Sequence, residues 1–462
     1  MNANAPLPSL TRELAAVALE VANTELPAAA LEAAVRLAQH AFGVTIAGSA
    51  LTVARIARAS VGDDGGPCLI FGSGGHHTAG DAAFANAVSG HASLLEDSGP
   101  GGARDGSHPG TYVFPAALAV AEQQGATGLA VILAIAAAYE TVSRLGAITP
   151  AAAFARGFRA VPVLAPFGAA AAAGVLCKVS PEQLSASFGI AANLASGFNQ
   201  GFLDGTMEPY LHPAFAARNG ILASRLAAAG CTASANALDG ERGLFAALAG
   251  SSVVAESATT RELAVCRVGT KRFATCLYNQ GTLALIRDSF DAGVHAARID
   301  RVTLLRPADG QNGLHAPGVA APPPYTTALG MQMSARFTAA AALLGRPVES
   351  GQYYEDAAAD AEVHALAARV ALVGHDAPHV IVEAALHEGR VVELSSTGES
   401  ALQFSTAATR EQFDARVRPV LGDGTDALLA LLADLAHLDN IRSVTAHVRK
   451  WHVAARPPKE NR

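Results

Sequence analysis

The hydrophobic pattern divides the chain into a long helical stretch, a shorter stretch with strands and a helical end. Up to about residue 265, apolar positions recur at helical spacing between short glycine or proline breaks. Residues 27–48 begin with Pro27 in a first turn and stop at Gly48, and residues 180–197 begin with Ser-Pro-Glu and stop at a glycine. Both patterns are typical of packed helices.

Short runs of β-branched residues follow the helical stretch. They cover residues 299–307, 368–374, 379–386 and 389–394, and His387–Gly389 suit the turn of a hairpin. A proline-rich loop and a helical stretch at residues 328–344 separate the first run from the others. From about residue 400 helical patterns return, most clearly at residues 426–438.

This order of elements predicts a mostly α fold. We expect a large all-helical domain formed by residues 1–265 and 401–462, with a smaller α+β domain at residues 266–400 inserted between them. Clefts where two domains meet are favoured ligand sites. A functional site is therefore expected between the two.

Composition and charge narrow the class of protein. Half of the residues are hydrophobic and 16% are charged, which excludes a disordered chain, and the abundance of alanine favours close helix packing. A net charge of −7 without a basic stripe makes nucleic acid an unexpected partner. Five widely spaced cysteines signal neither a disulfide framework nor a zinc site, which indicates a reducing compartment.

Neither a signal peptide nor a membrane span is predicted. The N-terminus lacks a charged start followed by an apolar run. The most apolar stretch, residues 129–145, is broken by Glu140 and Arg144 before it reaches the roughly 20 residues that a span needs. We expect a cytoplasmic protein that does not contact a membrane.

The first candidate for chemistry is a glycine-rich loop that interrupts the helices. Within a dozen residues it carries Asp97, Ser98, Asp105 and His108, directly before a helix-like stretch. Acids, a hydroxyl and an imidazole at one helix mouth can transfer protons. The alternative is a surface loop whose acids are solvated.

Two further stretches carry cations. Lys271 and Arg272 follow a Gly-Thr turn at the expected domain boundary and precede Tyr278, which suits a carboxylate ligand, although two solvated surface charges are an equal alternative. Arg159 precedes a helix rich in small residues, whose N-terminus can attract an anion or serve close packing.

Glu208 and His212 lie four residues apart and can face one cleft. Pro209 and Pro213 are expected to interrupt the helix, however, so the spacing of four residues does not by itself place both side chains on one face. Nucleophile-elbow, Walker and dinucleotide motifs are missing from the sequence, and the adjacent His76 and His77 have no likely ligands near them. No metal site is predicted.

An ordered set of motifs resembles the MmgE/PrpD family, which includes 2-methylcitrate dehydratase, cis-aconitate decarboxylase and iminodisuccinate epimerase. The motifs lie at residues 108–128, 155–176, 186–197, 211–245 and 271–276. The resemblance implies a cofactor-free homodimer whose active site lies between a helical domain and an α+β lid. It also implies proton chemistry next to a carboxylate, with loss of water, loss of CO2 or inversion of a stereocentre.

By position, the resemblance carries over the family's His-Pro-Gly histidine to His108 and its lysine to Lys271, and places Ser98 after the acid pair Glu96 and Asp97. Other polar positions of the family are changed. The residues that stand where the family has Asp, His, Lys, His and Tyr are Leu94, Arg159, Pro209, Gln280 and Phe337.

We therefore predict a divergent lyase that acts on a small carboxylate- or carbonyl-bearing metabolite by dehydration or decarboxylation. His108 is the expected acid or base, Lys271 stabilises negative charge and Asp97 orients His108. The expected substrate-binding residues are Ser98, Arg159, Glu208, His212, Arg272, Tyr278 and Gln280. Methylcitrate and cis-aconitate are disfavoured because few cations remain for a tricarboxylate. An isomerase, epimerase or cyclase, and a non-catalytic binding protein, are the alternatives.

Overall fold

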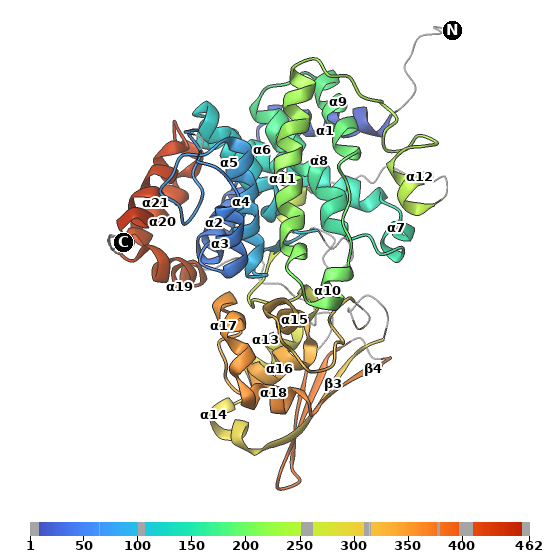
Figure 1. The fold of residues 1–462 in the computed structure, drawn as a ribbon, viewed down its shortest axis with the longest axis vertical. Helices are drawn as coiled ribbons and strands as arrows, with labels where there is room; N and C mark the ends of the chain where they lie inside the picture. Colours follow the sequence, from blue (N-terminus) through green and yellow to red (C-terminus); the bar gives the residue numbers. More distant parts are fainter. Residues whose placement is uncertain are drawn as a thin grey trace.

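The computed structural model describes residues 9–63, 65–99, 107–250, 262–308, 314, 316–376, 379–396 and 410–454. Figure 1 shows a broad mass of helices above a narrower part that contains a sheet. The predicted mostly α fold with a small α+β part is confirmed. The boundaries placed at residues 265 and 400 stay predictions. Asp105 lies outside the described residues.

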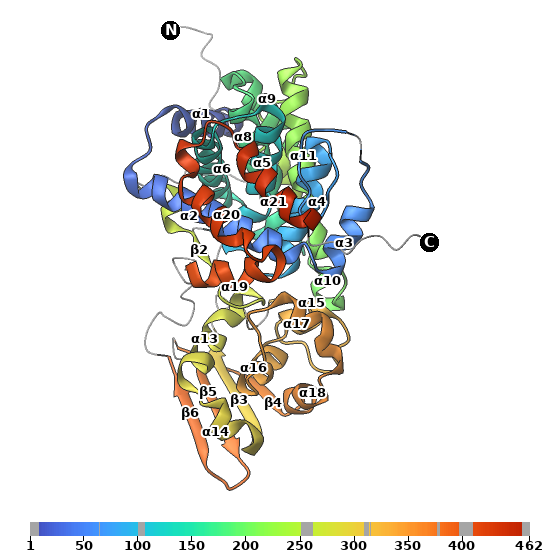
Figure 2. The ribbon, with the colours of Figure 1, turned by 90° about the vertical axis from the view of Figure 1, so that its left-hand side faces the viewer.

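The first 250 residues supply most of the helical mass. Its helices are α1 (Leu10–Asn23), α2 (Ala28–Gly48), α3 (Thr52–Ala59), α4 (Ala79–Ala92), α5 (Val113–Gln124), α6 (Gly128–Ile148), α7 (Ala151–Ala155), α8 (Ala160–Leu176), α9 (Pro181–Ala192), α10 (Gln200–Asp204), α11 (Glu208–Ala228) and α12 (Leu244–Ala249). The C-terminal helices α19 (Arg410–Leu421), α20 (Gly424–Ala433) and α21 (Arg442–Ala454) return to this mass, where α19 and α20 contact α2 (Figure 2).

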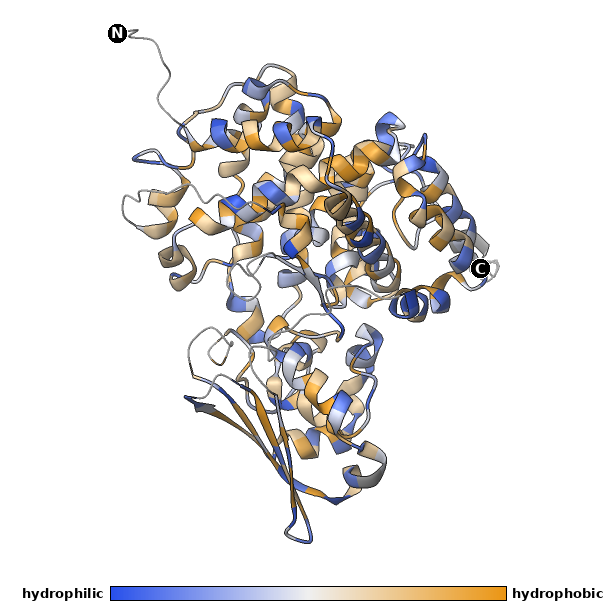
Figure 3. Cartoon of the chain, turned by 180° about the vertical axis from the view of Figure 1, so that it is seen from behind, coloured by the Kyte–Doolittle hydropathy of each residue, from blue (hydrophilic) through white to orange (hydrophobic). Residues whose placement is uncertain are grey.

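Small residues let the central helices approach closely. α8 and α11 pack against each other, and a Cβ atom added to Gly220 of α11 would stand 2.4 Å from the Cβ of Ala169 in α8. Such contact buries apolar surface without large side chains. The alanine-rich composition therefore serves close helix packing, as predicted. Figure 3 shows hydrophobic residues concentrated along the central helices.

Helix α6 corrects one expectation. It continues through Glu140 and Arg144, both good helix formers, and Arg144 Nε pairs with Glu140 Oε1 at 2.8 Å. Its 21 residues are long and apolar enough to cross a membrane. Of its apolar window, 67% is buried inside the protein, as in the core helix of a soluble protein.

The lower part contains a four-stranded sheet in the order β4-β3-β5-β6. The strands are β3 (Ile299–Pro307), β4 (Val370–His375), β5 (Ile381–Leu386) and β6 (Val391–Ser395). β3 pairs with β4 in parallel and with β5 in antiparallel orientation, and β5 pairs with β6 across the predicted turn, where Gly389 has a φ of 84°. The helices of this part are α13 (Gln280–Ser289), α14 (Ala292–His295), α15 (Ala328–Met333), α16 (Ala335–Leu343), α17 (Gly351–Asp356) and α18 (Ala361–Ala367).

A second, two-stranded sheet lies within the helical mass. β1 (Asp97–Ser98) pairs antiparallel with β2 (Gly269–Thr270), with Asp97 opposite Thr270 and Ser98 opposite Gly269. This short ladder brings together two segments that are far apart in the sequence.

Candidate active site

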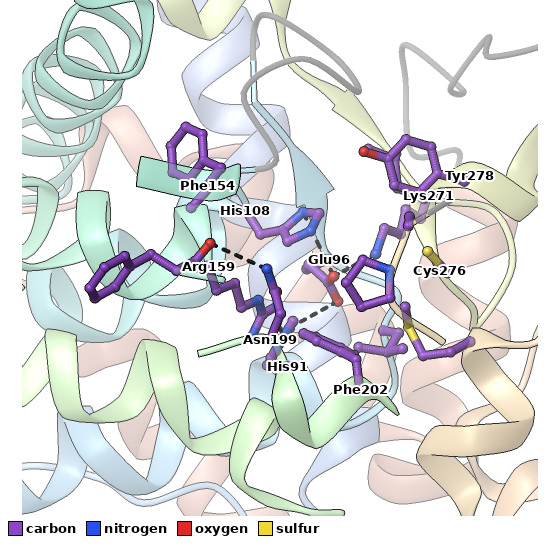
Figure 4. Close-up of a pocket in the computed structure, with 17 residues that line it drawn as sticks. His91, Glu96, His108, Phe154, Arg159, Asn199, Phe202, Lys271, Cys276 and Tyr278 are labelled. Atoms are coloured by element: carbon purple, nitrogen blue, oxygen red, sulfur yellow. Dashed lines mark hydrogen bonds and ion pairs between the residues drawn. The ribbon is translucent and has the colours of Figure 1, made fainter. Parts of the chain in front are cut away.

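A cavity of about 230 Å³ lies where the helical mass meets the α+β part. The helical part contributes His91, Glu96, His108 and Arg159, and the segment after β2 contributes Lys271 and Tyr278 (Figure 4). The structure therefore brings His108, Arg159, Lys271 and Tyr278 to one cavity.

The β1–β2 ladder places a carboxylate against the predicted lysine. Glu96 precedes β1 and Lys271 follows β2, and Lys271 Nζ donates to Glu96 Oε1 at 2.5 Å although the two residues are 175 positions apart. Both side chains are only 2% exposed. A buried ion pair of this kind persists only when each charge has its partner.

Two histidines complete the surroundings of Glu96. His91 Nδ1 lies 3.4 Å from Glu96 Oε2, and His108 Nδ1 lies 3.7 Å from Glu96 Oε1. Burial alone would raise the pKa of the Glu96 carboxyl, but Lys271, His91 and His108 outweigh it and hold that pKa well below its usual value. Glu96 is therefore the ionised carboxylate at the centre of the site.

His108 is held as a neutral imidazole. Its Nδ1–H donates to the main-chain oxygen of Asp97 at 2.8 Å, so Nε2 carries the lone pair. Burial and then the nearby Lys271 ammonium lower the pKa of His108 well below its usual value, against the opposing effect of Glu96. A neutral imidazole whose second nitrogen makes no hydrogen bond to any described residue is suited to accept a proton.

The Arg159 side chain binds a main-chain carbonyl oxygen of α11 that lacks its usual N–H donor within the helix. Helix α11 continues through Pro213, contrary to the expected interruption, but Pro213 has no N–H to donate to the oxygen of Pro209. Arg159 Nη1 donates to that oxygen at 2.8 Å. Pro209 itself lies in the first turn, where a missing N–H has little consequence.

The same guanidinium contacts two histidines. Arg159 donates to His91 Nε2 at 2.9 Å and to His212 Nδ1 at 3.2 Å. Burial, Arg159 and His91 lower the pKa of His212 to about 3, so it is a neutral acceptor. His212 therefore contacts Arg159 without lining the cavity. Glu208, the residue predicted to face the same cleft as His212, is exposed at the start of α11.

Asp97 orients His108 through its backbone. Its carboxylate points instead to Tyr139 of α6, whose hydroxyl donates to Oδ2 at 2.5 Å, and to the N–H of Gly110 at 2.9 Å. Burial raises the pKa of Asp97 to about 7, against the effect of these two hydrogen bonds. The contact with His108 is thus made by the main-chain oxygen of Asp97 and not by its carboxylate.

Three other predicted binding residues lie away from the cavity. Arg272 pairs with Asp288 at 2.9 Å at the surface. Gln280 closes the turn after Lys271, because its Oε1 accepts from the N–H groups of Arg272 and Phe273 at 3.1 Å each. Ser98 is buried in β1, and its hydroxyl has no hydrogen-bond partner among the described residues. None of the three lines the cavity.

His91 and Glu96 are two polar residues of the cavity whose roles the sequence did not reveal. His91 lies near the end of α4, a helix of small apolar residues that predicts a core position. Glu96 precedes Asp97 in an acid pair, and this pair is the feature of the sequence that points to Glu96. Which acid faces the cavity depends on the β1–β2 register.

Leu94 shows how the site departs from the pattern of the family that the sequence resembles. It lines the cavity at the position where the family pattern has an aspartate, and its φ of 52° is in the left-handed region, which a leucine rarely adopts. The apolar side chain therefore occupies a backbone conformation better suited to Asp or Asn.

The charges that line the described part of the cavity nearly balance. Arg159 and Lys271 are cations and Glu96 is an anion, whereas His91 and His108 have lowered pKa values and are neutral. The remainder is one net positive charge. No group of three or more metal-binding side chains occurs among the described residues.

Comparison with known proteins identifies the family. The MmgE/PrpD N-terminal domain profile matches residues 12–256, which is more than half of the 462-residue chain. The chain belongs to the MmgE/PrpD family. Membership at this level supports a lyase-like role of the dehydratase or decarboxylase type.

One curated relative shares part of the sequence. The chain is 28% identical over 232 residues to a cis-aconitate decarboxylase-like protein from Aspergillus oryzae. The match covers 48% of this chain and 47% of that protein, so the chain spans about half the length of the curated relative.

Proposed function

We propose that this MmgE/PrpD member is a lyase that removes a proton from the carbon next to a carboxylate and expels water from the neighbouring carbon. The observation that carries the proposal is the meeting of a neutral imidazole, His108, with two cations, Lys271 and Arg159, in one cavity. A base and fixed positive charge are what an enolate-like intermediate requires.

In the proposed reaction, the unprotonated Nε2 of His108 takes the proton. The electron pair of the broken C–H bond delocalises onto the carboxylate, whose developing charge faces Lys271 and Arg159. The C–O bond of the neighbouring carbon then breaks as the double bond forms. The imidazolium returns its proton to the departing hydroxide, which leaves as water.

The state of His108 favours dehydration over decarboxylation. A decarboxylase must supply a proton to the carbanion that remains when CO2 leaves, whereas the lowered pKa of His108 holds it in the base form. Protonation from solvent would be needed for the decarboxylation. The two reactions are distinguished by whether water or CO2 is the second product.

The arrangement of the histidines disfavours a two-base epimerase. The Nε2 lone pair of His91 accepts from Arg159, which leaves the His91 proton on Nδ1, 3.4 Å from Glu96 Oε2. His212 accepts from Arg159 and does not line the cavity. Among the described histidines that line the cavity, His108 alone keeps a ring lone pair that accepts no protein hydrogen bond. One base on one face suits elimination better than inversion.

The test is proton exchange in deuterated water. A panel of 3-hydroxy acids is incubated with the protein, and deuterium at the carbon next to the carboxylate and the appearance of the unsaturated acid are followed by NMR. His108→Ala should lower both rates by about 10²–10⁴-fold, the usual contribution of a general base. The control His437→Ala changes an exposed histidine on the surface and should leave both rates unchanged.

Full exchange in a folded His108→Ala protein would overturn the role of His108. Binding of an acid without exchange in the unaltered protein would instead support a non-catalytic member, for which the replacement of the family's aspartate by Leu94 is the main argument. Release of CO2 in place of water would assign the decarboxylase reaction.

We also propose that the protein is a cytoplasmic homodimer. All five cysteines are free thiols, which suits a reducing compartment. Phe215, Leu222 and Leu226 lie along one face of α11 and are 51%, 49% and 40% exposed, a surface that a second copy would cover. Light scattering should report a dimer, and Leu222→Glu should yield monomers. A monomeric unaltered protein at micromolar concentration would contradict this.

A further inference from the structure

The apolar side of the cavity is as well defined as its charged side. Phe154, Phe158 and Phe202 line it from the helical part, and Leu277 and Met333 line it from the α+β part. We call the three phenylalanines the aromatic wall. Phe202 is only 7% exposed, and Phe154 and Phe158 are half-buried.

Main-chain hydrogen bonds hold Phe158 of the aromatic wall in place. Phe158 and Phe198 form an isolated antiparallel bridge, flanked by hydrogen bonds from Arg159 N to Gly197 O at 2.9 Å and from Asn199 N to Gly157 O at 3.0 Å. The Asn199 side chain adds a bond to the oxygen of Phe158 at 3.2 Å (Figure 4). This part of the wall is therefore preformed, which lowers the entropy cost of binding against it.

The aromatic wall and the cations share one side chain. The Arg159 guanidinium lies 4.6 Å from the ring centroid of Phe202, within cation–π range. This contact places the polar and apolar ends of the cavity side by side. A ligand that engages Arg159 through a carboxylate thus extends its next atoms along the wall.

Charge counting limits the number of carboxylates. Arg159 and Lys271 are the cations that line the described part of the cavity, and Lys271 is already paired with Glu96. A tricarboxylate would leave at least one carboxylate against the aromatic wall without a partner, which is costly in a buried site. One carboxylate, in contrast, balances the net positive charge.

We infer that the substrate is a monocarboxylic acid with an apolar body, whose carboxylate meets Arg159 and Lys271 and whose body packs between the aromatic wall and Leu277 and Met333. The inference rests on the proposed function, because it places the reacting carbon next to His108. It names a substrate class for that site that differs from a tricarboxylate.

Calorimetry with three probe acids tests the inference without requiring turnover. Phenylacetate carries one carboxylate and an aromatic body, acetate carries the carboxylate alone, and tricarballylate carries three carboxylates. Phenylacetate should bind at least about tenfold more tightly than either of the others, the gain expected from burying an aromatic ring. Tricarballylate that binds as tightly as phenylacetate would overturn the inference.

Variants of the aromatic wall sharpen the test. Phe202→Ala should weaken phenylacetate about tenfold and weaken acetate by much less, and Phe154→Leu should weaken phenylacetate less than Phe202→Ala does. The matched control Phe215→Ala changes an exposed phenylalanine of α11 outside the cavity lining. Phenylacetate affinity that is indifferent to both wall variants would contradict the inference.

A variant that should bind a ligand more tightly provides a test that a misfolded protein cannot pass. Phe158→Lys adds a cation to the half-buried wall, so tricarballylate should bind about fivefold more tightly than to the unaltered protein, as for a partly exposed ion pair. An unchanged or lower affinity in a folded Phe158→Lys protein would count against the inferred position of the wall.

Failure of this inference and failure of the proposed function give different results. Exchange confined to tricarboxylic acids overturns the substrate class and leaves the role of His108 intact. Phenylacetate binding that depends on Phe202, together with no exchange in any acid, leaves the substrate class intact and overturns the lyase.

Discussion

Glu96 and Asp97 are neighbours in the chain and equally buried, yet their surroundings shift their pKa values in opposite directions. Glu96 faces an ammonium and two imidazoles, and its pKa is held well below the usual value. Asp97 faces a phenol and a backbone N–H without a close cation, and burial raises its pKa to about 7. Burial alone therefore does not set the charge of a carboxyl; its partners do.

Glu96 and Asp97 therefore have different roles in the site. Glu96 keeps a charge in the cavity, where it balances Lys271 and contacts both histidines. Asp97 joins β1 to the turn after His108 and to α6, and so sets the position of the imidazole. Three predictions test this division, beginning with the largest effect.

Removing the cation that faces Glu96 should have the largest consequence. Lys271→Met leaves a buried carboxylate without its partner, which should lower the free energy of unfolding by about 3–5 kcal/mol and abolish turnover. Chemical denaturation and the exchange assay measure the two effects. The neighbouring Arg272→Gln removes a surface charge 39% exposed and should change stability by less than about 0.5 kcal/mol.

A double variant separates charge from packing. Lys271→Met combined with Glu96→Leu removes both charges, so most of the lost stability should return while turnover stays absent. Continued instability of the double variant would show that the ion pair is not the reason for the effect.

Removing the titration of Asp97 should change how stability depends on pH. The carboxyl ionises near its ordinary 3.8 when unfolded but only near 7 when folded, so the folded state holds the extra proton and wild-type stability falls as pH rises through this interval. Asp97→Asn should remove that fall, a gain of up to about 4 kcal/mol at neutral pH. Denaturation midpoints between pH 4 and 8 measure it.

Glu96 provides the matched opposite case. Its folded pKa lies below its ordinary value of 4.5, so its contribution is present above that pH and is lost as the pH falls. Glu96→Gln should therefore flatten the acid side of the stability profile, whereas Asp97→Asn flattens the side toward neutrality. Identical profiles for the two variants would contradict the comparison.

Removing the phenol that faces Asp97 should have the smallest effect. Tyr139→Phe deletes one hydrogen bond to the carboxylate, which should cost about 1 kcal/mol and move the pKa of Asp97 upward, because that bond lowers it. The pH at which stability stops falling should rise accordingly. Tyr354→Phe is the control, since the buried hydroxyl of Tyr354 has no hydrogen-bond partner among the described residues.

Local signals in the sequence predicted the secondary structure well. The first β-branched run coincides with β3 at Ile299–Pro307, and the hairpin turn at His387–Gly389 joins β5 to β6. Pro27 and Gly48 bracket α2. Periodicity and turn chemistry act over a few residues, which is why these features were predictable.

The site was only partly predictable because its contacts are distant in the chain. A ladder of two residues joins β1 to β2 and selects Glu96 as the partner of Lys271, yet so short a strand has no recognisable pattern. Pro213 was expected to break a helix, and instead the carbonyl it leaves free holds Arg159. Both outcomes depend on tertiary partners that no local rule contains.

Two successive residues of α6 hold two segments that contribute to the cavity. Tyr139 binds Asp97 beside His108, and Glu140 accepts from the N–H of Ala264, at the start of the segment that leads to Lys271. Neighbouring residues of an α-helix point about 100° apart, so one helix reaches both segments at once. Helix α6 is thus a common support for the segments that carry His108 and Lys271, and inserting one residue before Tyr139 should displace both contacts together.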